Sequence, residues 1–268
     1  MILLSRLAKA TAVSACLLCS PAYAFFPFQT DDTGTQGTGG NQIELDYQFL
    51  QEYNDDIDED GRVIDTNTGS SNDYSLTYTY GVSENIDIFL GLSRQTSPVN
   101  GWQNTEIGAK WVFAGDQTKD WSFAMAPSVI LPVSKDMQDA GLGNAQTNGS
   151  LNLIGSYLSE DYELHLNAGY VSNLSAQTEQ SEAQRKSIWS ISAAPILVIN
   201  DQWKIGIDIG LSTNPGYNSR YTLTGEVGVS YAPIESLQIG LGLLGSKDIS
   251  ANDNARSYAI VAGITYQF

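Results

Sequence analysis

The sequence predicts an all-β fold: a transmembrane antiparallel up-and-down β-barrel of about twelve strands, preceded by an N-terminal signal peptide. Three observations support this. A two-residue hydrophobic period recurs from Gln42 onward, long and short connections alternate, and the last strand ends on an aromatic residue. The composition, with abundant aromatic residues and 13 basic against 30 acidic residues, argues against disorder and against nucleic-acid binding. The sequence has no run of about 20 apolar residues, which a transmembrane helix would need.

Residues 1–24 have the pattern of a secretory signal peptide: a basic start, an apolar stretch from Ala10 to Leu18 and a small-x-small cleavage site at 22–24. The mature chain would then carry 11 basic and 30 acidic residues, a net charge of −19. Both cysteines, Cys16 and Cys19, would be removed, which excludes disulfides and thiol chemistry from the mature protein. A lipoprotein processing site ending at Cys16 is the alternative.

Each predicted strand has one apolar face without charge, as lipid-facing barrel strands have. The twelve apolar faces fall within residues 43–49, 74–80, 86–92, 107–113, 123–131, 151–157, 162–170, 189–197, 203–211, 221–231, 237–243 and 258–268. This gives three parts, a signal peptide at 1–24, a periplasmic N-terminal segment at 25–41 and an outer-membrane barrel at 42–268. Residues 25–40 are rich in Gly and Thr, and they could instead plug the lumen.

The opposite face of each strand is polar and would line the lumen of a barrel. Its candidate lining residues are Glu44, Asp46, Asp87, Glu106, Lys110, Glu163, His165, Lys204, Asp208 and Glu226. A soluble sandwich would instead place its apolar face inward, so the hydrophobic period alone does not separate the two folds. Lysines among the carboxylates predict ion pairs across the interior, and the excess of carboxylates predicts a channel that disfavours anions.

The lengths of the connections and the positions of the aromatic residues favour the membrane barrel over the soluble sandwich. Long connections are expected near 54–72, 94–103, 133–149, 174–187, 212–220 and 245–256, and shorter ones alternate with them. Aromatic residues flank both kinds of connection, as in the two interfacial girdles of a membrane barrel. The chain ends in phase with the lipid face at Phe268, and an even number of strands closes the sheet without an open edge.

Two prolines, Pro127 and Pro195, fall within predicted strands. Proline cannot donate a ladder hydrogen bond, so we expect each to mark a bulge that bends the barrel wall. A kink that opens a lateral exit toward lipid is the functional alternative.

The single histidine, His165, raises the question of lipid hydrolysis. That chemistry requires a serine nucleophile beside the histidine and access for the lipid. The neighbours of His165 on the same strand face are Glu163 and Asn167, which supply no nucleophile. We therefore expect a hydrogen-bond network in the lumen, and no enzyme.

The first long connection contains a pattern similar to a calcium-binding EF-hand loop. Oxygen-bearing residues recur around a glycine, which permits a tight turn, and the candidate ligands are Asp56, Asp58, Asp60, Asp65 and Asn67. Position 12 is Asn67 instead of a bidentate glutamate, and no helices flank the loop. An acidic, solvated loop tip is therefore the alternative to a bound calcium ion.

The segment after the cleavage site carries a family resemblance. It contains Thr30-Asp31-Asp32, followed by Gly40-Asn41-Gln42-Ile43-Glu44 at the start of the first strand. This resembles the opening of the outer-membrane transporters of the MetA pathway of phenol degradation. The resemblance implies import of aromatic or other hydrophobic compounds, and it transfers no functional residues.

The sequence therefore predicts a channel or transporter in the bacterial outer membrane for passive uptake of small molecules. Its expected partners are outer-membrane lipid, lipopolysaccharide and a small-molecule solute, with no nucleic acid. The alternative is a surface-binding or structural barrel with acidic, calcium-binding outer loops. An open lumen or an apolar binding patch would favour transport, and the inward-facing Phe89, Ile130 and Leu244 are the candidates for such a patch.

Overall fold

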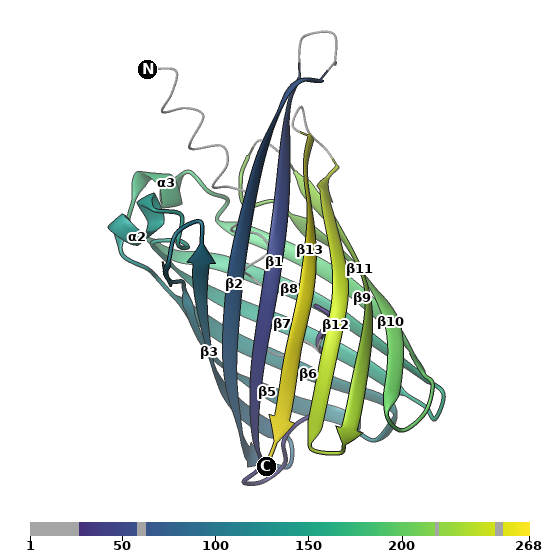
Figure 1. The fold of residues 1–268 in the computed structure, drawn as a ribbon. Coiled ribbons are helices and arrows are strands. Elements are labelled where there is room, and N and C mark those ends of the chain that lie inside the picture. The colour runs from purple at the N-terminus through teal and green to yellow at the C-terminus, as the bar shows by residue number, and fades with distance from the viewer. Residues whose placement is uncertain (1–26, 58–62, 218–219, 250–253) are drawn as a thin grey trace.

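The structure, a computed structural model, describes residues 27–57, 63–217, 220–249 and 254–268, which form a closed antiparallel barrel (Figure 1). The signal peptide predicted at 1–24 lies outside these residues. The strands are β1 (Asn41–Ile57), β2 (Val63–Ser83), β3 (Ile86–Ser97), β4 (Gly101–Trp102), β5 (Thr105–Asp116), β6 (Lys119–Leu131), β7 (Gln146–Leu158), β8 (Tyr162–Ala176), β9 (Ser187–Val198), β10 (Trp203–Thr213), β11 (Tyr221–Ile234), β12 (Leu237–Asp248) and β13 (Asn254–Gln267). Two short helices, α2 (Lys135–Asp139) and α3 (Glu179–Glu182), lie in the outer loops. None of the helices in the described part of the chain is long and apolar enough to cross a membrane.

The barrel closes because the first strand pairs with the last. The β1–β13 ladder runs from Gln42 opposite Gln267 to Asp55 opposite Asn254. Each of the other long strands pairs with its two neighbours, while the two-residue β4 pairs with β3 alone. The predicted barrel of twelve long strands is therefore confirmed, and the sandwich is excluded because closure leaves no edge strand.

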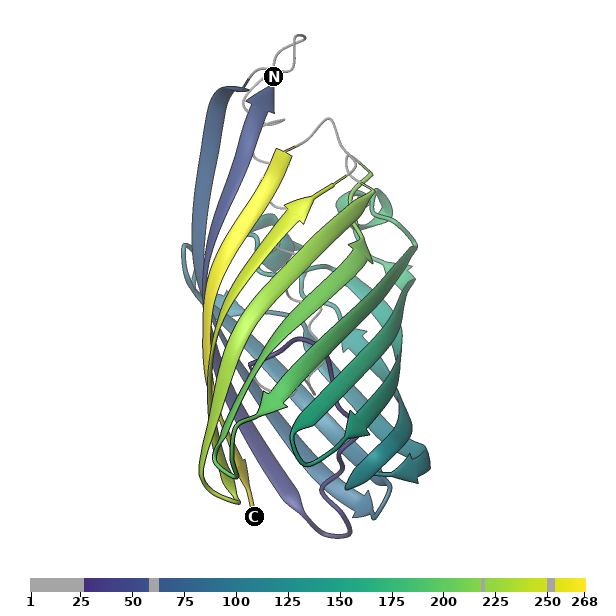
Figure 2. The same cartoon turned by 90° about the vertical axis from the view of Figure 1, so that its right-hand side faces the viewer.

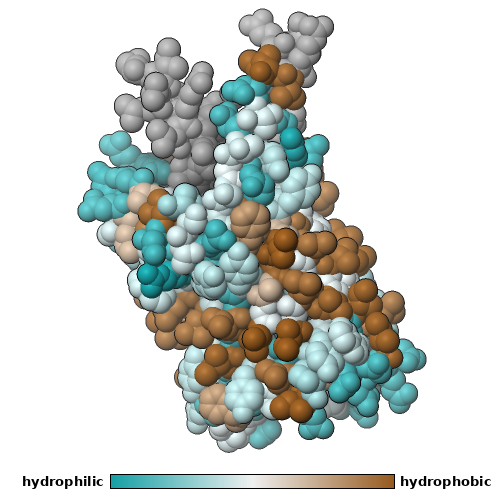
Figure 3. All heavy atoms as spheres, in the orientation of Figure 1, coloured by the Kyte–Doolittle hydropathy of each residue, from teal (hydrophilic) through white to brown (hydrophobic). Residues whose placement is uncertain are grey.

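The wall is apolar outside and polar inside, as the two-residue period predicts. On β10, Ile207 and Ile209 are 44% and 54% exposed, whereas Asp208 between them is 5% exposed. Figure 3 shows hydrophobic side chains gathered over the middle and lower wall, with hydrophilic side chains above them. An apolar exterior around a polar interior is the arrangement of a membrane-spanning barrel.

Aromatic residues pair across neighbouring strands at both ends of the wall. The paired rings have centroids 4.4–5.4 Å apart; the pairs are Trp203–Tyr231 and Trp121–Tyr157 near the short turns, and Tyr170–Trp189 and Tyr47–Tyr74 near the outer loops. Rings with an apolar body and a polar edge are stable where lipid meets water, so these pairs form the two interfacial girdles.

The first long connection differs from its prediction. Residues 54–72 were expected to form a loop, but β1 and β2 stay paired up to Ile57 opposite Val63. They form a hairpin that rises above the barrel (Figures 1 and 2). The hydrophobic period stops earlier because backbone pairing continues in water without an apolar face, so the pattern marks the membrane-spanning part of the strands only.

The prediction of a bulge at each of the two prolines is wrong. The β5–β6 ladder is interrupted between Gly108–Ser128 and Trp111–Met125, and the β9–β10 ladder between Gly206–Ile196 and Ile209–Ala193. The register is the same on both sides of each interruption. Pro127 and Pro195 therefore remove ladder bonds without inserting a residue, because their other edges remain paired with β7 and β8.

The lipid-facing wall gives a first testable prediction. Leu241, 52% exposed, lies between the two aromatic girdles, and Leu241→Arg should lower the free energy of unfolding by about 2–4 kcal/mol, the cost of a cation at the bilayer midplane. Ile64→Arg is the matched control, because Ile64 is 68% exposed in the hairpin above the barrel. Urea unfolding in phospholipid vesicles measures the free energy of unfolding of both variants. Equal effects of the two substitutions would contradict the assignment of Leu241 to the lipid-facing wall.

Candidate functional site

The N-terminal segment lies inside the barrel. The sequence predicted a periplasmic segment at 25–41, with a plug of the lumen as the alternative. The described residues 27–40 run through the lumen. Figure 2 shows the segment, in purple, descending from the interior of the barrel to its lower end before β1 begins. We call residues 27–40 the plug.

Polar contacts hold the middle of the plug to strands on both sides of the barrel. The backbone N–H of Thr30 donates to Asp208 Oδ2 at 2.7 Å, and its hydroxyl donates to Oδ1 at 2.9 Å. Lys110 Nζ, from the other side, donates to the carbonyl oxygen of Asp32 at 3.3 Å and lies 3.7 Å from the Asp32 carboxylate. The plug therefore spans the lumen between β5 and β10.

The two proline interruptions coincide with these contacts. In register, Lys110 faces Ala126, next to Pro127, and Asp208 faces Ala194, next to Pro195. At each interruption the inward side chain opposite the break contacts the plug. The breaks in the ladder are therefore placed where the plug meets the wall.

The N-terminal end of the plug is apolar. Phe28 is 1% exposed and packs against Ala194 and Ile196. Two glycines provide its space, because a Cβ on Gly206 would lie 2.9 Å from Phe28 Cζ, and one on Gly228 would lie 3.0 Å from Phe28 Cε1. A buried phenyl ring stabilises this end of the plug by roughly 2–3 kcal/mol of apolar transfer.

The lower end of the plug is held at the turn between β2 and β3. Backbone bonds join Gly39 N to the carbonyl oxygen of Gly81 at 2.8 Å and Gly81 N to that of Gly40 at 2.9 Å. Just above, the backbone N–H of Gln36 donates to the Asp87 carboxylate. Gly37 and Gly39 have φ of +70° and +83°, which glycine adopts without strain, so the chain can reverse here and enter β1.

The plug also carries a buried carboxyl group. Asp31 accepts a long bond from Asn152, while its backbone N–H and carbonyl oxygen bond the Asn167 amide. Burial raises the pKa of Asp31 to about 8. This group is therefore mostly neutral at pH 7, although the sequence alone would count it as a negative charge.

Every predicted lining residue points into the barrel, and three of them border the cavity described below. The ten candidates are Glu44, Asp46, Asp87, Glu106, Lys110, Glu163, His165, Lys204, Asp208 and Glu226. These three are Glu106, Asp208 and Glu226, whereas Asp87 and Lys110 contact the plug. Their role in conduction stays a prediction.

An interior ion pair and a serine–histidine contact occur together on β7, β8 and β10. Lys204 Nζ lies 2.7 Å from Glu163 Oε1, and His165 Nε2 lies 3.6 Å from Glu163 Oε2. On its other side, His165 Nδ1 lies 2.9 Å from the hydroxyl of Ser156. A serine–histidine–glutamate group is therefore present. Its serine, Ser156, lies on the neighbouring strand and could not be identified from the sequence pattern.

This group lacks the access that a hydrolase needs. Ser156 and His165 are each 1% exposed, and the Ser156 hydroxyl accepts the backbone N–H of Thr33 at 3.0 Å. A nucleophile must reach its substrate, and this hydroxyl lies beneath the plug with its hydrogen-bonding capacity in use. The arrangement is that of an anchor for the plug.

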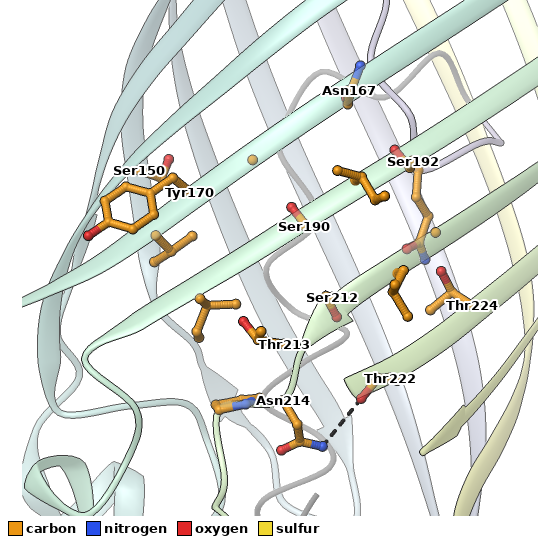
Figure 4. A pocket seen from close by; sticks show the side chains of 18 of the residues that line it. Ser150, Asn167, Tyr170, Ser190, Ser192, Ser212, Thr213, Asn214, Thr222 and Thr224 are labelled. Atoms are coloured by element: carbon orange, nitrogen blue, oxygen red, sulfur yellow. Dashed lines mark hydrogen bonds between the residues drawn. The ribbon is translucent and has the colours of Figure 1, made fainter. Parts of the chain in front are cut away.

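A cavity of about 180 Å³ lies on the outer side of the plug, with Gln29 of the plug in its lining. Amide and hydroxyl side chains of neighbouring strands surround it, among them Ser190, Ser192, Ser212 and Thr224 (Figure 4). Inward aliphatic side chains also line it, among them Ile130, Val171, Ile188 and Leu244. Of the apolar residues expected to face inward, Phe89 lies outside this lining and is buried against Gly108.

The calcium candidates are only partly described. Asp58 and Asp60 lie outside the described residues, while Asp56 pairs with Asp65 and Asn67 pairs with Asn54 in the β1–β2 ladder. Within the described ranges, no group of three or more histidine, cysteine, aspartate or glutamate residues is placed to hold a metal ion. Calcium binding at this hairpin stays a prediction.

Solved structures share this architecture, whereas no protein-family model and no curated protein matches the sequence. The chain is similar to the COG4313 outer membrane channel from Pseudomonas putida F1, with 12% identity, a TM-score of 0.69 and coverage of 88% of this chain and 98% of that chain. The KdgM porin in complex with disordered oligogalacturonate gives 13% identity, a TM-score of 0.54 and coverage of 84% and 99%. The CymD monoaromatic hydrocarbon channel has 10% identity and a TM-score of 0.50, and the match covers 87% of this chain and 90% of that chain. The chain has the fold of these channels.

Proposed function

We propose that this protein is an outer-membrane channel for the passive uptake of small molecules. The observation that carries the proposal is the cavity on the outer side of a plug, lined by hydroxyl, amide and aliphatic side chains, inside a closed barrel with an apolar exterior. A solute can collect in such a cavity, and the plug limits its further passage. The names of the similar structures, which are channels and a porin, support this proposal.

The lining favours small solutes that combine an apolar ring with a polar group. The cavity of about 180 Å³ compares with roughly 150 Å³ for an engineered protein cavity that accepts benzene. Aliphatic side chains such as Ile130 and Leu244 would contact a ring, and the serine and asparagine side chains would bind a hydroxyl group. A phenol-like compound is therefore the preferred solute class, in agreement with the resemblance to the MetA-pathway transporters.

Single-channel recording of the refolded mature chain in a planar bilayer tests the proposal, after heat-modifiable gel mobility has confirmed folding. We expect a small, steady conductance that favours cations, because carboxylates outnumber lysines around the lumen. Phenol added on the side of the outer loops should lower this current in proportion to its occupancy of the cavity, and uncharged glycerol serves as the control. A folded barrel that never conducts, even without its plug, would contradict the proposal and favour the surface-binding alternative.

A further inference from the structure

Two cations lie side by side on the outward face of the wall, at the end of the barrel that carries the long loops. Lys247 on β12 lies opposite Arg256 on β13 in register. Both continue the outward-facing rows of their strands, which contain Ile260 and Tyr258 on β13 and Leu243 on β12. An outward tyrosine marks the boundary between lipid and water, and the cations lie two residues, or about 7 Å, beyond Tyr258. They are therefore placed at the headgroups of the outer leaflet.

Positive charge is in excess on this face. Arg256 donates to the carboxylate of Asp55 on β1, but its side chain is still 34% exposed, and a guanidinium group has five N–H donors. Lys247 is exposed and makes no hydrogen bond or ion pair with the described residues. Arg220, directly before β11, adds a third exposed cation, whereas Asp248 beside Lys247 is buried on the lumen side. An anion that approaches from outside would meet Lys247 and Arg256 together.

The apolar wall has a gap directly below these cations. Gly245 on β12 and Gly225 on β11 lie opposite each other in register, and both occupy outward positions. No atom lies within 4 Å of a Cβ at Gly225, and the atom nearest to a Cβ at Gly245 would be Tyr258 Cδ1, at 3.7 Å. We call this place the glycine gap. Its surrounding outward side chains are Lys247 and Leu223 above, Tyr258 and Ile209 at the sides, and Leu243 and Val227 below.

We propose that this face binds lipid A, the phosphorylated lipid of lipopolysaccharide, with a phosphate on Lys247 and Arg256 and an acyl chain in the glycine gap. The ammonium group and the guanidinium group donate charge-assisted hydrogen bonds to phosphate oxygens. An acyl chain in the gap would cover backbone that no side chain covers, and it would contact the apolar side chains around it. Free phosphate would use the cations alone, so the gap favours a phosphate that carries a hydrocarbon chain.

A second outward cation at the same end of the barrel has neither feature, which makes it a matched control. Arg94 on β3 donates from Nε and Nη2 to the side-chain oxygen of Asn100, and its guanidinium carbon lies 5.4 Å from the ring centroid of Trp102. Below it, Leu92 and Leu76 lie opposite each other and fill the wall. Arg94 therefore has partners of its own and no gap beneath it.

The experiment measures lipid binding by native mass spectrometry of the refolded mature chain in neutral detergent. Lipid A, dephosphorylated lipid A and dioleoyl phosphatidylglycerol are each titrated into the parent protein and into the variants Lys247→Ala, Gly225→Leu and Arg94→Ala. Inorganic phosphate is added as a competitor in a separate series. Heat-modifiable gel mobility shows that each variant folds, and all three substitutions lie on the outer surface, so the conductance tests the proposed channel function separately.

Lys247→Ala should weaken the binding of lipid A about tenfold, through the loss of a charge-assisted hydrogen bond, and should leave the dephosphorylated lipid unaffected. Gly225→Leu should weaken the binding of both forms, because the new side chain fills the glycine gap, and Arg94→Ala should change neither. Equal affinity of the parent and Lys247→Ala for lipid A, or an equal loss with Arg94→Ala, would overturn the inference. Phosphatidylglycerol that binds as tightly as lipid A, or displacement of lipid A by millimolar phosphate, would contradict the assignment to lipopolysaccharide.

A second measurement uses the unsubstituted chain. Lys247 and Lys135, which begins α2 in another outer loop, are both exposed and open to an amine-acetylating reagent. Lipid A should slow the acetylation of Lys247 several-fold and leave that of Lys135 unchanged, as peptide mass spectrometry can record. Equal rates at Lys247 with and without lipid A, or equal protection of both lysines, would contradict a site at the glycine gap.

Discussion

Deletion of residues 25–36 should raise the single-channel conductance of the refolded barrel several-fold. The plug crosses the lumen from Asp208 on β10 to Lys110 on β5, so it obstructs the route for ions. Gly37 to Gly40 stay in this variant, because their backbone bonds to Gly81 close the lower end beside the β2–β3 turn. All twelve long strands are also retained, and heat-modifiable mobility should show that the variant folds.

The matched control for this deletion fixes the plug in place. The hydroxyls of Thr33 and Ser122 lie 2.5 Å apart, so cysteines at these two positions are close enough for a disulfide. The mature chain carries no cysteine of its own, since Cys16 and Cys19 both precede the predicted cleavage site. The oxidised Thr33→Cys/Ser122→Cys protein should keep the low conductance of the parent. A deletion variant that conducts no better than this locked protein would show that the plug does not limit the current.

Gly228→Val should expel the N-terminal end of the plug and move the conductance toward that of the deletion variant. The new Cβ would lie 2.5 Å from Pro27 Cγ and 3.0 Å from Phe28 Cε1, distances that packed side chains do not tolerate. Overpacking of this kind costs about 1–3 kcal/mol, and the N-terminal segment can avoid the cost by leaving its site. The barrel wall should keep its stability, because the clash involves no strand other than β11.

Gly225→Val is the control on the same strand, since no atom lies within 4 Å of a Cβ at Gly225. A Thr33→Cys substitution in both backgrounds reports the plug directly, because Thr33 is 1% exposed when the plug is seated. A water-soluble maleimide should label this cysteine rapidly with Gly228→Val and slowly with Gly225→Val. Equal labelling rates, together with equal conductance, would refute the packing role assigned to Gly228.

The plug shows where prediction from the sequence reached its limit. Residues 25–40 are polar and rich in glycine, which is compatible with a periplasmic tail and with a plug. The contacts that decide between them join residues far apart in the chain, such as Thr30 with Asp208 and Thr33 with Ser156. Ser156 gave no signal of its own, because a serine on the polar face of a strand is ordinary until the register places His165 beside it.

The sequence by itself determined the barrel, the number of long strands and the direction in which each side chain points. These follow from a local rule, since successive side chains of a strand alternate between two faces and only one face can be apolar when lipid lies outside and water inside. The tertiary structure alone decided the continued pairing of β1 with β2 above the barrel, the unchanged register at Pro127 and Pro195, and the position of the plug. Those features depend on contacts across the lumen and between strands, which the alternation of side chains does not record. Glu226 illustrates both parts. Its inward direction follows from the period, whereas only the folded chain shows that neither of its carboxylate oxygens has a hydrogen-bond partner among the described residues.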